Sequence, residues 1–267
     1  MDMNARFNLR RTPFTREVEV SEMYAHPQRE ELLENLLQVV DQRMSAALIA
    51  PAGLGKTSLL RALRARLPEA RYDVRYVKVT GLSKRDMCRE IAATLGLPPV
   101  GTYPGLVRAV QGAVERRTSD DGVRTVLILD EAHEMRPDVL GMLRLLTNFS
   151  MDSRLVLSVL LVGQPLLGQL LRRQELEDLA QRLTWYGTLR PLSRDETRAY
   201  IAHRCTLAGA TPAPFDDRAL EALYEMGKGN PHAIDHLARR ALETAHRADA
   251  STVAAQHVIA ARATLQP

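Results

Sequence analysis

Aromatic residues are scarce in this sequence. Phenylalanine, tryptophan and tyrosine together make up 4% of its 267 residues, so a folded core has to be built mainly from Leu, Val, Ile and Ala. Aliphatic side chains of this kind fill the strands of buried parallel sheets. The composition therefore suits helices packed on a parallel sheet.

Cysteine is almost absent as well. The two cysteines, Cys88 and Cys205, lie far apart in the chain, and neither belongs to a cluster with zinc-ligand spacing. A disulfide framework is improbable at this chain length. We expect two free thiols in a reducing compartment and no structural metal site.

Long hydrophobic runs are also missing. No stretch approaches the ~18 consecutive apolar residues that a membrane-spanning helix needs, and residues 1–11 contain no apolar run of signal-peptide length. We therefore expect a cytoplasmic protein without a membrane segment.

The nucleophile pattern of serine hydrolases, G-x-S-x-G, does not occur either, which argues against a serine hydrolase.

The charge balance is mildly basic, with a formal net charge of +4 and a pI of about 9.3. A basic excess is compatible with binding to nucleic acid, and equally with an ordinary solvated surface. Composition alone leaves these two interpretations open.

Short apolar runs alternate with segments of helical periodicity over the first two thirds of the chain, a pattern typical of a doubly wound α/β sheet. The predicted strands are residues 46–50, 74–79, 123–129, 155–162 and 184–189. The predicted helices between and before them are residues 28–43, 58–67, 84–95, 106–117, 137–147 and 166–181. Beyond Leu192 only helices are predicted, over residues 194–208, 216–226, 231–248 and 252–263. The layout predicts an N-terminal arm (1–24), an α/β core (25–191) and a helical lid domain (192–267).

Residues 50–57, APAGLGKT, nearly match the phosphate-binding pattern G-x-x-x-x-G-K-[ST] between a predicted strand and a predicted helix. Gly53 and Gly55 allow backbone amides to turn toward phosphate, and the following helix N-terminus favours anions. Lys56 is expected to reach the β- and γ-phosphates of ATP. Ala50 replaces the first glycine of the pattern. The predicted ATP-binding residues of this loop are Pro51, Ala52, Gly53, Leu54, Gly55, Lys56, Thr57 and Ser58.

A second motif, residues 126–131 (VLILDE), places two carboxylates at the C-terminal end of a predicted strand. Parallel sheets bind ligands at that end. Asp130 is predicted to hold Mg²⁺ together with the Thr57 hydroxyl, and Glu131 to polarise the attacking water.

With these motifs in place, the sequence resembles the AAA+ ATPases that include the ExeA component of type II secretion and the TnsC/TniB-type helpers of DNA transposition. The resemblance covers nearly the whole chain, through residues 50–57, 127–149, 155–167, 179–197, 200–204 and 227–241. It implies a P-loop core with a parallel five-stranded sheet flanked by helices, followed by a small all-helical lid. It also implies that the chain hydrolyses ATP.

The resemblance assigns catalytic roles to two further residues. Gln164 occupies the place of a polar sensor of the γ-phosphate, with capping of the next helix as the alternative. Arg182 occupies the place of an arginine finger that reaches a neighbouring subunit's ATP. For Arg182 the alternative is a surface arginine, and Arg172 and Arg173 are its nearby rivals.

The second-sensor position departs from the family pattern Gly-x-Pro-Arg, because His232 follows Gly229, Asn and Pro. A histidine carries less charge at neutral pH, so we expect slower ATP turnover without loss of ATP binding. Arg239 and Arg240 lie further along the same helix and are candidates to compensate. Tyr24 and His26 occupy the place of the family's base pocket, or else pack.

Three residues are candidates for contact with DNA. Lys84 and Arg85 begin a predicted helix, and Thr102 lies in a later loop. Helix N-termini with basic side chains suit a phosphate backbone. A solvated helix start is the alternative. His133, two residues past Glu131, is a candidate to position that glutamate or simply to pack.

The leading functional hypothesis is a transposition helper. It would assemble with ATP as a ring or helical filament on double-stranded DNA, without base specificity, and recruit or activate a transposase. The basic charge and the absence of a membrane span and of further domains favour it. The alternatives are an ExeA-like ATPase that acts on protein partners in secretion or envelope assembly without DNA, and a switch ATPase that only binds nucleotide.

Overall fold

The computed structural model describes residues 2–98, 101–149 and 153–263. The chain forms two compact units. An α/β unit consists of Pro27–Ala52 and Lys56–Leu189, and a helical unit consists of the chain up to His26, Gly53–Gly55 and the chain from Arg190 onward. The phosphate-binding loop predicted from the sequence is therefore divided between the two units along the chain.

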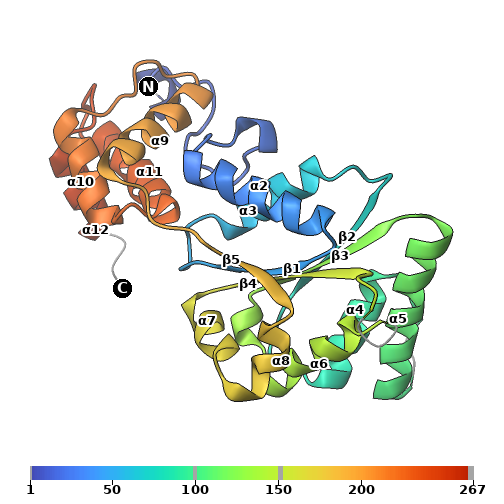
Figure 1. Cartoon of the computed structure of the whole chain (residues 1–267). Helices are drawn as coiled ribbons and strands as arrows, with labels where there is room; N and C mark the ends of the chain where they lie inside the picture. Colours follow the sequence, from blue (N-terminus) through green and yellow to red (C-terminus); the bar gives the residue numbers. More distant parts are fainter. Residues whose placement is uncertain (1, 99–100, 150–152, 264–267) are drawn as a thin grey trace. The chain divides into compact units, whose positions relative to one another are not determined.

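Five parallel strands form the sheet of the α/β unit (Figure 1), as the sequence predicted. Their order is β2-β3-β4-β1-β5, so β2 and β5 are the edge strands. Every residue of β4 is buried, which is expected for a central strand covered on both faces. The strands are β1 (Ser45–Ile49), β2 (Tyr72–Lys78), β3 (Arg124–Asp130), β4 (Leu157–Gly163) and β5 (Leu183–Thr188).

Helices cover both faces of this sheet. Figure 1 shows α2 and α3 on one face and α4 to α8 on the other. Their buried stripes are built from aliphatic and methionine side chains, in keeping with the scarcity of aromatic residues. The helices are α2 (Pro27–Asp41), α3 (Lys56–Arg66), α4 (Lys84–Thr94), α5 (Tyr103–Asp120), α6 (Pro137–Thr147), α7 (Pro165–Leu171) and α8 (Glu177–Ala180), with short 3₁₀ turns η2 (Ala132–Glu134) and η3 (Gln174–Leu176).

One predicted helix, residues 166–181, is interrupted in the structure. Helix α7 ends at Leu171, and helical structure resumes with η3 and then α8. The four residues 172–175 are all exposed and polar, so a continuous helix would have no apolar residue in that turn to hold it against the core. Leu176 and Leu179 then restart the buried stripe.

The helical unit packs four helices around a second hydrophobic core. Three of them begin with side-chain caps: the Ser193 hydroxyl accepts from the Glu196 N–H, Asp216 Oδ1 accepts from the Ala219 N–H, and Asn230 Oδ1 accepts from the amides of His232 and Ala233. The elements of this unit are α1 (Met3–Arg6), η1 (Val20–Glu22), α9 (Arg194–Leu207), α10 (Asp217–Gly227), α11 (Pro231–Arg247) and α12 (Ala255–Ala263).

The N-terminal segment is part of the helical unit. Phe7, Leu9 and Phe14 are buried in its core. The Arg10 N–H donates to the Ala208 carbonyl at 2.7 Å, and the Arg204 guanidinium donates to the carbonyl of residue 15 at 2.6 Å. These contacts fasten the segment to the helix α9 region.

None of the helices in the described part of the chain has both the length and the apolar character that a bilayer crossing requires. Both cysteines are buried free thiols, as the sequence predicted.

Candidate nucleotide-binding site

The loop after β1 has the backbone of a phosphate-binding turn. Gly53 (φ +80°) and Gly55 (φ +93°) lie in the left-handed region, which glycine adopts without steric penalty. Helix α3 begins immediately afterwards at Lys56, so its first amides point into the turn. Ala50, which replaces a glycine of the usual pattern, is buried and donates its N–H to the Gly163 carbonyl at 3.0 Å. The loop therefore accommodates the extra methyl group.

Gly53 is further required by its neighbours within the helical unit. A Cβ atom at this position would lie 2.5 Å from Asn230 Oδ1 and 3.0 Å from the Cβ of His232. The carbonyl of Gly53 accepts a hydrogen bond of 3.3 Å from the His232 N–H. The start of α11 thus packs closely on this glycine.

Lys56 is a buried cation whose hydrogen-bond partners, among the described residues, are neutral. Its side chain is 6% exposed, and Nζ donates to the carbonyls of Ala50 (3.0 Å) and Pro51 (3.2 Å). Burial lowers the pKa of Lys56, while the charges of Glu131 and Asp130 oppose that shift. Because a buried ammonium is costly unless it is paired with an anion, the loop fits the binding of phosphate. Ala52, Leu54 and Ser58 are further residues of the predicted loop.

Asp130, at the end of β3, is 2% exposed and uses both carboxylate oxygens. Oδ1 accepts the Glu131 N–H at 2.9 Å, and Oδ2 accepts the Tyr76 hydroxyl at 2.9 Å. The Thr57 hydroxyl lies 3.5 Å from the same Oδ2. A hydroxyl and a carboxylate are oxygen donors of the type that Mg²⁺ prefers. The structure thus brings together the two residues predicted to hold the metal.

Tyr76 was not predicted as part of the site. The sequence pattern identifies it only as a residue of a strand. The partner of its hydroxyl becomes apparent once β2 is known to lie beside β3. Burial, followed by the hydrogen bond to Asp130, raises the pKa of the Tyr76 phenol. The hydroxyl therefore stays protonated and donates a hydrogen bond to the carboxylate.

Glu131 has a strained backbone, with φ +59° and ψ 32° in the left-handed region. A non-glycine residue in that region costs about 1–3 kcal/mol and is found preferentially at functional sites. Among the described residues, no donor forms a hydrogen bond with its buried Oε2 atom. That oxygen is therefore available as an acceptor for a reacting group.

His133 lies beside this oxygen but does not donate to it. Its Nδ1 is 3.4 Å from Glu131 Oε2 and accepts a long hydrogen bond from the Gln164 N–H, also 3.4 Å. Its Nε2 is 3.2 Å from Glu134 Oε1. A proton on Nε2 lets His133 donate to Glu134 Oε1 while Nδ1 accepts from the Gln164 N–H. His133 thereby connects Glu131 to the backbone of the residue predicted as γ-phosphate sensor.

Gln164 precedes α7 and makes no side-chain cap to that helix. Its side chain is therefore not used in the capping role that the sequence allowed.

Arg182 lies half-buried between α8 and β5, and its backbone N–H donates to the Leu179 carbonyl at 3.1 Å. The two alternative candidates for the arginine finger, Arg172 and Arg173, are exposed, and Arg173 lies 3.5 Å from Glu175.

In the helical unit, His232 lies in the first turn of α11. Partial burial lowers the pKa of His232, and the charges of His236 and Arg16 lower it further. A neutral imidazole is therefore favoured at this position. Arg239 and Arg240, the candidates to compensate, both lie beside Glu243, at 3.4 and 3.1 Å.

Tyr24 and His26 make packing contacts inside the helical unit. The Tyr24 ring lies 5.7 Å from that of Tyr200, and buried His26 places Nε2 2.9 Å from Glu196 Oε1. Arg190 chiefly, with His26 contributing, lowers the pKa of the Glu196 carboxyl. These contacts agree with the packing alternative that the sequence also allowed.

The three candidate DNA contacts are held by local interactions. Lys84 Nζ lies 3.8 Å from Asp138 Oδ2, and Arg85 donates to the Gly101 carbonyl at 2.5 Å. The Thr102 hydroxyl caps α5 by accepting the Gly105 N–H at 3.3 Å. The bond from Arg85 to Gly101 places Arg85 next to the loop that carries Thr102.

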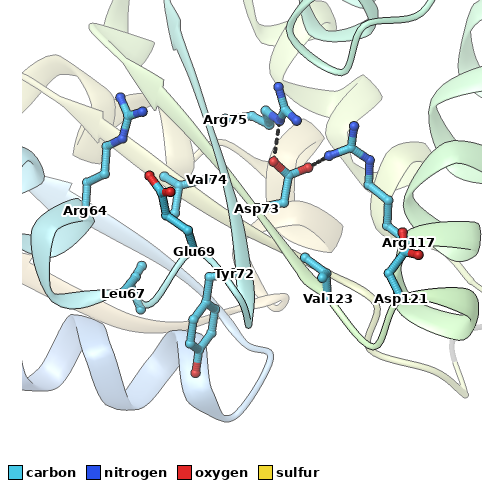
Figure 2. A pocket seen from close by; sticks show the side chains of 10 residues that line it. All are labelled: Arg64, Leu67, Glu69, Tyr72, Asp73, Val74, Arg75, Arg117, Asp121 and Val123. Atoms are coloured by element: carbon cyan, nitrogen blue, oxygen red, sulfur yellow. Dashed lines mark ion pairs between the residues drawn. The ribbon is translucent and has the colours of Figure 1, made fainter.

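A cavity of about 520 Å³ lies near the first residues of β2 and β3, at the sheet end opposite Asp130 (Figure 2). In it, the Asp73 carboxylate lies between Arg75, at 2.6 Å, and Arg117. Its charged lining groups are three arginines and three carboxylates, which balance each other: Arg64, Glu69, Asp73, Arg75, Arg117 and Asp121. This balance does not suit a polyphosphate.

Comparison with known proteins identifies relatives of the chain. Residues 26–171 match the protein family described as AAA domain. General secretion pathway protein A of Aeromonas hydrophila is 33% identical over 239 residues, covering 88% of this chain and 43% of that protein. The chain thus spans less than half the length of this curated relative.

Two solved structures share the fold. The Aeropyrum pernix ORC1 protein in complex with DNA has a TM-score of 0.68 and 19% identity, covering 91% of this chain and 67% of that one. The Thermotoga maritima RuvB Holliday junction branch migration motor has a TM-score of 0.60 and 20% identity, covering 94% and 73%. At these identities the likeness is one of fold.

Proposed function

The chain belongs to the AAA domain family, and we propose that it is an ATPase that binds ATP with Mg²⁺ and hydrolyses it. The observation that carries this proposal is that the glycine loop after β1 and the Asp130 carboxylate at the end of β3 lie together. A glycine turn leads there into buried Lys56, and the Thr57 hydroxyl lies 3.5 Å from Asp130 Oδ2. A lysine at a helix N-terminus suits phosphate, and the two oxygens suit Mg²⁺.

The side chains divide the chemistry between them. Residues 51–58 would hold the phosphates, with Thr57 and Asp130 as metal ligands. When bound, Mg²⁺ supplies positive charge that neutralises the phosphate oxygens. Glu131 is suited to accept a proton from the attacking water, because its Oε2 has no hydrogen-bond donor among the described residues. His133 does not compete for that oxygen while its Nδ1 accepts from Gln164.

Replacement of Glu131 by glutamine tests the catalytic assignment. We expect Glu131→Gln to retain ATP binding and to lose at least about 100-fold in phosphate release, the range typical of general-base removal. Binding of a fluorescent ATP analogue and a phosphate-release assay measure the two quantities. Glu134→Gln, which removes the carboxylate on the other side of His133, is the matched control and should keep its rate within about twofold. An unimpaired rate in Glu131→Gln would sink the assignment.

We further propose that the active form is a homo-oligomer in which Arg182 acts on a neighbour's ATP and Gln164 senses the γ-phosphate. The family resemblance supports both roles. Mixing tests the first role, at an ATP concentration too low to saturate Lys56→Ala: that variant supplies Arg182 without bound ATP, and Arg182→Ala binds ATP without the finger. Hydrolysis that recovers only in the mixture supports action between subunits. A mixture as inactive as its components contradicts it.

For the wider function, we propose ATP-dependent assembly on double-stranded DNA as a transposition helper that recruits or activates a transposase. The formal charge of +4 supports DNA binding, as does the proximity of Arg85 to the Thr102 loop. A fold shared with an ORC1 protein in complex with DNA supports it at the level of architecture.

Fluorescence anisotropy of labelled duplex DNA tests this proposal, with ATP, ADP or no nucleotide at two salt concentrations. We expect cooperative binding that requires ATP and weakens steeply with salt. Each DNA phosphate that the protein neutralises releases counterions, and added salt opposes that release. The double variant Lys84→Ala, Arg85→Ala should weaken binding, whereas Arg66→Ala, an exposed arginine paired with Glu30 and Glu34, should not. No binding by protein that does bind ATP overturns the proposal.

The second candidate is an ATPase that acts on protein partners in secretion. The 33% identity to a general secretion pathway protein favours it. This candidate predicts nucleotide-dependent association with another protein and no affinity for DNA, so the same anisotropy experiment separates the two functions.

A further inference from the structure

The Tyr76 side chain reaches the metal-side carboxylate from a neighbouring strand. In the parallel pairing of β2 with β3, Tyr76 is opposite Ile128 and Lys78 is opposite Asp130. Tyr76 is therefore two positions behind Asp130, and the length of its ring brings the hydroxyl forward to Oδ2 at 2.9 Å. No shorter side chain at that position would span the offset.

The two oxygens of Asp130 are held by donors from different parts of the chain. Oδ1 takes the Glu131 N–H, and Oδ2 takes the Tyr76 hydroxyl. The terminal torsion of an aspartate is soft, so a carboxylate that is held at one oxygen can still turn. The Tyr76 bond fixes the second oxygen, which is the one that lies 3.5 Å from Thr57.

Burial makes this hydrogen bond hard to replace. Asp130 is 2% exposed, and a buried carboxylate without donors is strongly disfavoured. The oxygen atom of a carboxylate has more than one lone-pair direction, so Oδ2 can accept from Tyr76 and still bind a cation. The tyrosine and a metal ion therefore do not exclude each other.

We propose that Tyr76 is a positioning residue for the Mg²⁺ site, which holds Oδ2 of Asp130 toward Thr57 before the metal arrives. The inference rests on the proposed binding of ATP with Mg²⁺. Partners of this kind, which orient a metal ligand without touching the metal, typically contribute 10–100-fold to metal affinity.

The test is a Mg²⁺ titration of fluorescent ATP binding by the full chain, comparing wild type with Tyr76→Phe. The phenylalanine keeps the ring and removes the hydroxyl. We expect the Mg²⁺ concentration at half-saturation to rise about tenfold, while ATP binding in the presence of a chelator stays unchanged. Melting temperatures verify that the variant is folded.

Tyr186→Phe is the matched control. Tyr186 is likewise an exposed strand tyrosine of the α/β unit, and its hydroxyl donates to the Ala180 carbonyl at 3.2 Å, away from Asp130. Its Mg²⁺ midpoint should equal that of wild type, whereas Asp130→Asn should abolish the Mg²⁺ dependence.

Two results would overturn the role of Tyr76 alone: a midpoint within twofold of wild type, or an equal loss of ATP binding with and without Mg²⁺, which indicates a general structural effect. A wild-type protein that binds no ATP under any condition overturns the proposed function and this inference together. The two failures are therefore distinguishable.

Discussion

The α/β unit and the helical unit differ in the charge of the candidate nucleotide-binding residues that each one carries. In the α/β unit, buried Asp130 has a donor on each oxygen and Lys56 is a buried cation. In the helical unit, the predicted second-sensor residue is His232, whose pKa is lowered by partial burial and neighbouring positive charge. The first region is organised for binding phosphate and metal, whereas the second contributes little charge. This difference predicts tight binding and slow turnover.

The largest effect should come from the α/β unit. Lys56→Ala removes the buried ammonium, and we expect ATP affinity to fall by roughly 100-fold or more, the size of a lost charge-assisted contact. Titration of a fluorescent ATP analogue measures it. His232→Ala, the counterpart in the helical unit, should change affinity by less than about fivefold. Equal losses in the two variants would remove the contrast between the regions.

An intermediate effect should come from the glycine that contacts α11. In Gly53→Ala, the new methyl group would meet Asn230 at 2.5 Å while the backbone stays at φ +80°, so we expect a loss of about 2 kcal/mol in the free energy of unfolding. Urea denaturation measures it. Gly96→Ala is the control, because Gly96 has φ +73° and open space around it, and should lose only about 1 kcal/mol. Identical losses would mean that contact with Asn230 and His232 is unimportant.

The smallest effect tests the histidine itself. His232→Arg restores the family's charged residue, and we expect the rate of ATP hydrolysis to rise by about fivefold, roughly 1 kcal/mol of transition-state stabilisation. Steady-state phosphate release at saturating ATP measures it, with His236→Arg on the same exposed side as the control. An unchanged rate of ATP hydrolysis would show that His232 does not limit turnover.

Several features could be predicted because they depend on local order in the sequence. The alternation of apolar runs and helical periods predicted five parallel strands between helices, and the structure confirms them. The loop at residues 50–57 and the Asp130–Glu131 pair follow from the position of glycine, lysine and carboxylates relative to strand ends. Thr57 and Asp130 lie together as the motif requires.

Other features carry no local signal. Phe7, Leu9 and Phe14 have no regular period among their polar neighbours, so their burial in the helical unit depends on contacts with helices some 200 positions later. The exposed turn that separates α7 from α8 also has no local signal, because the leucines on either side of it are buried by contacts with the rest of the α/β core.

The sequence by itself determined the type of protein: a P-loop α/β sheet, a helical C-terminal part, and the residues that would meet phosphate and Mg²⁺. Their chemistry depends on residue type and on spacing along one short segment. Only the tertiary structure decided which distant groups complete them. Tyr76 reaches Asp130 because β2 lies beside β3, and His133 accepts from Gln164 because β3 lies beside β4. Strand order and side-chain direction arise from packing the whole sheet, and no spacing within a single segment encodes them.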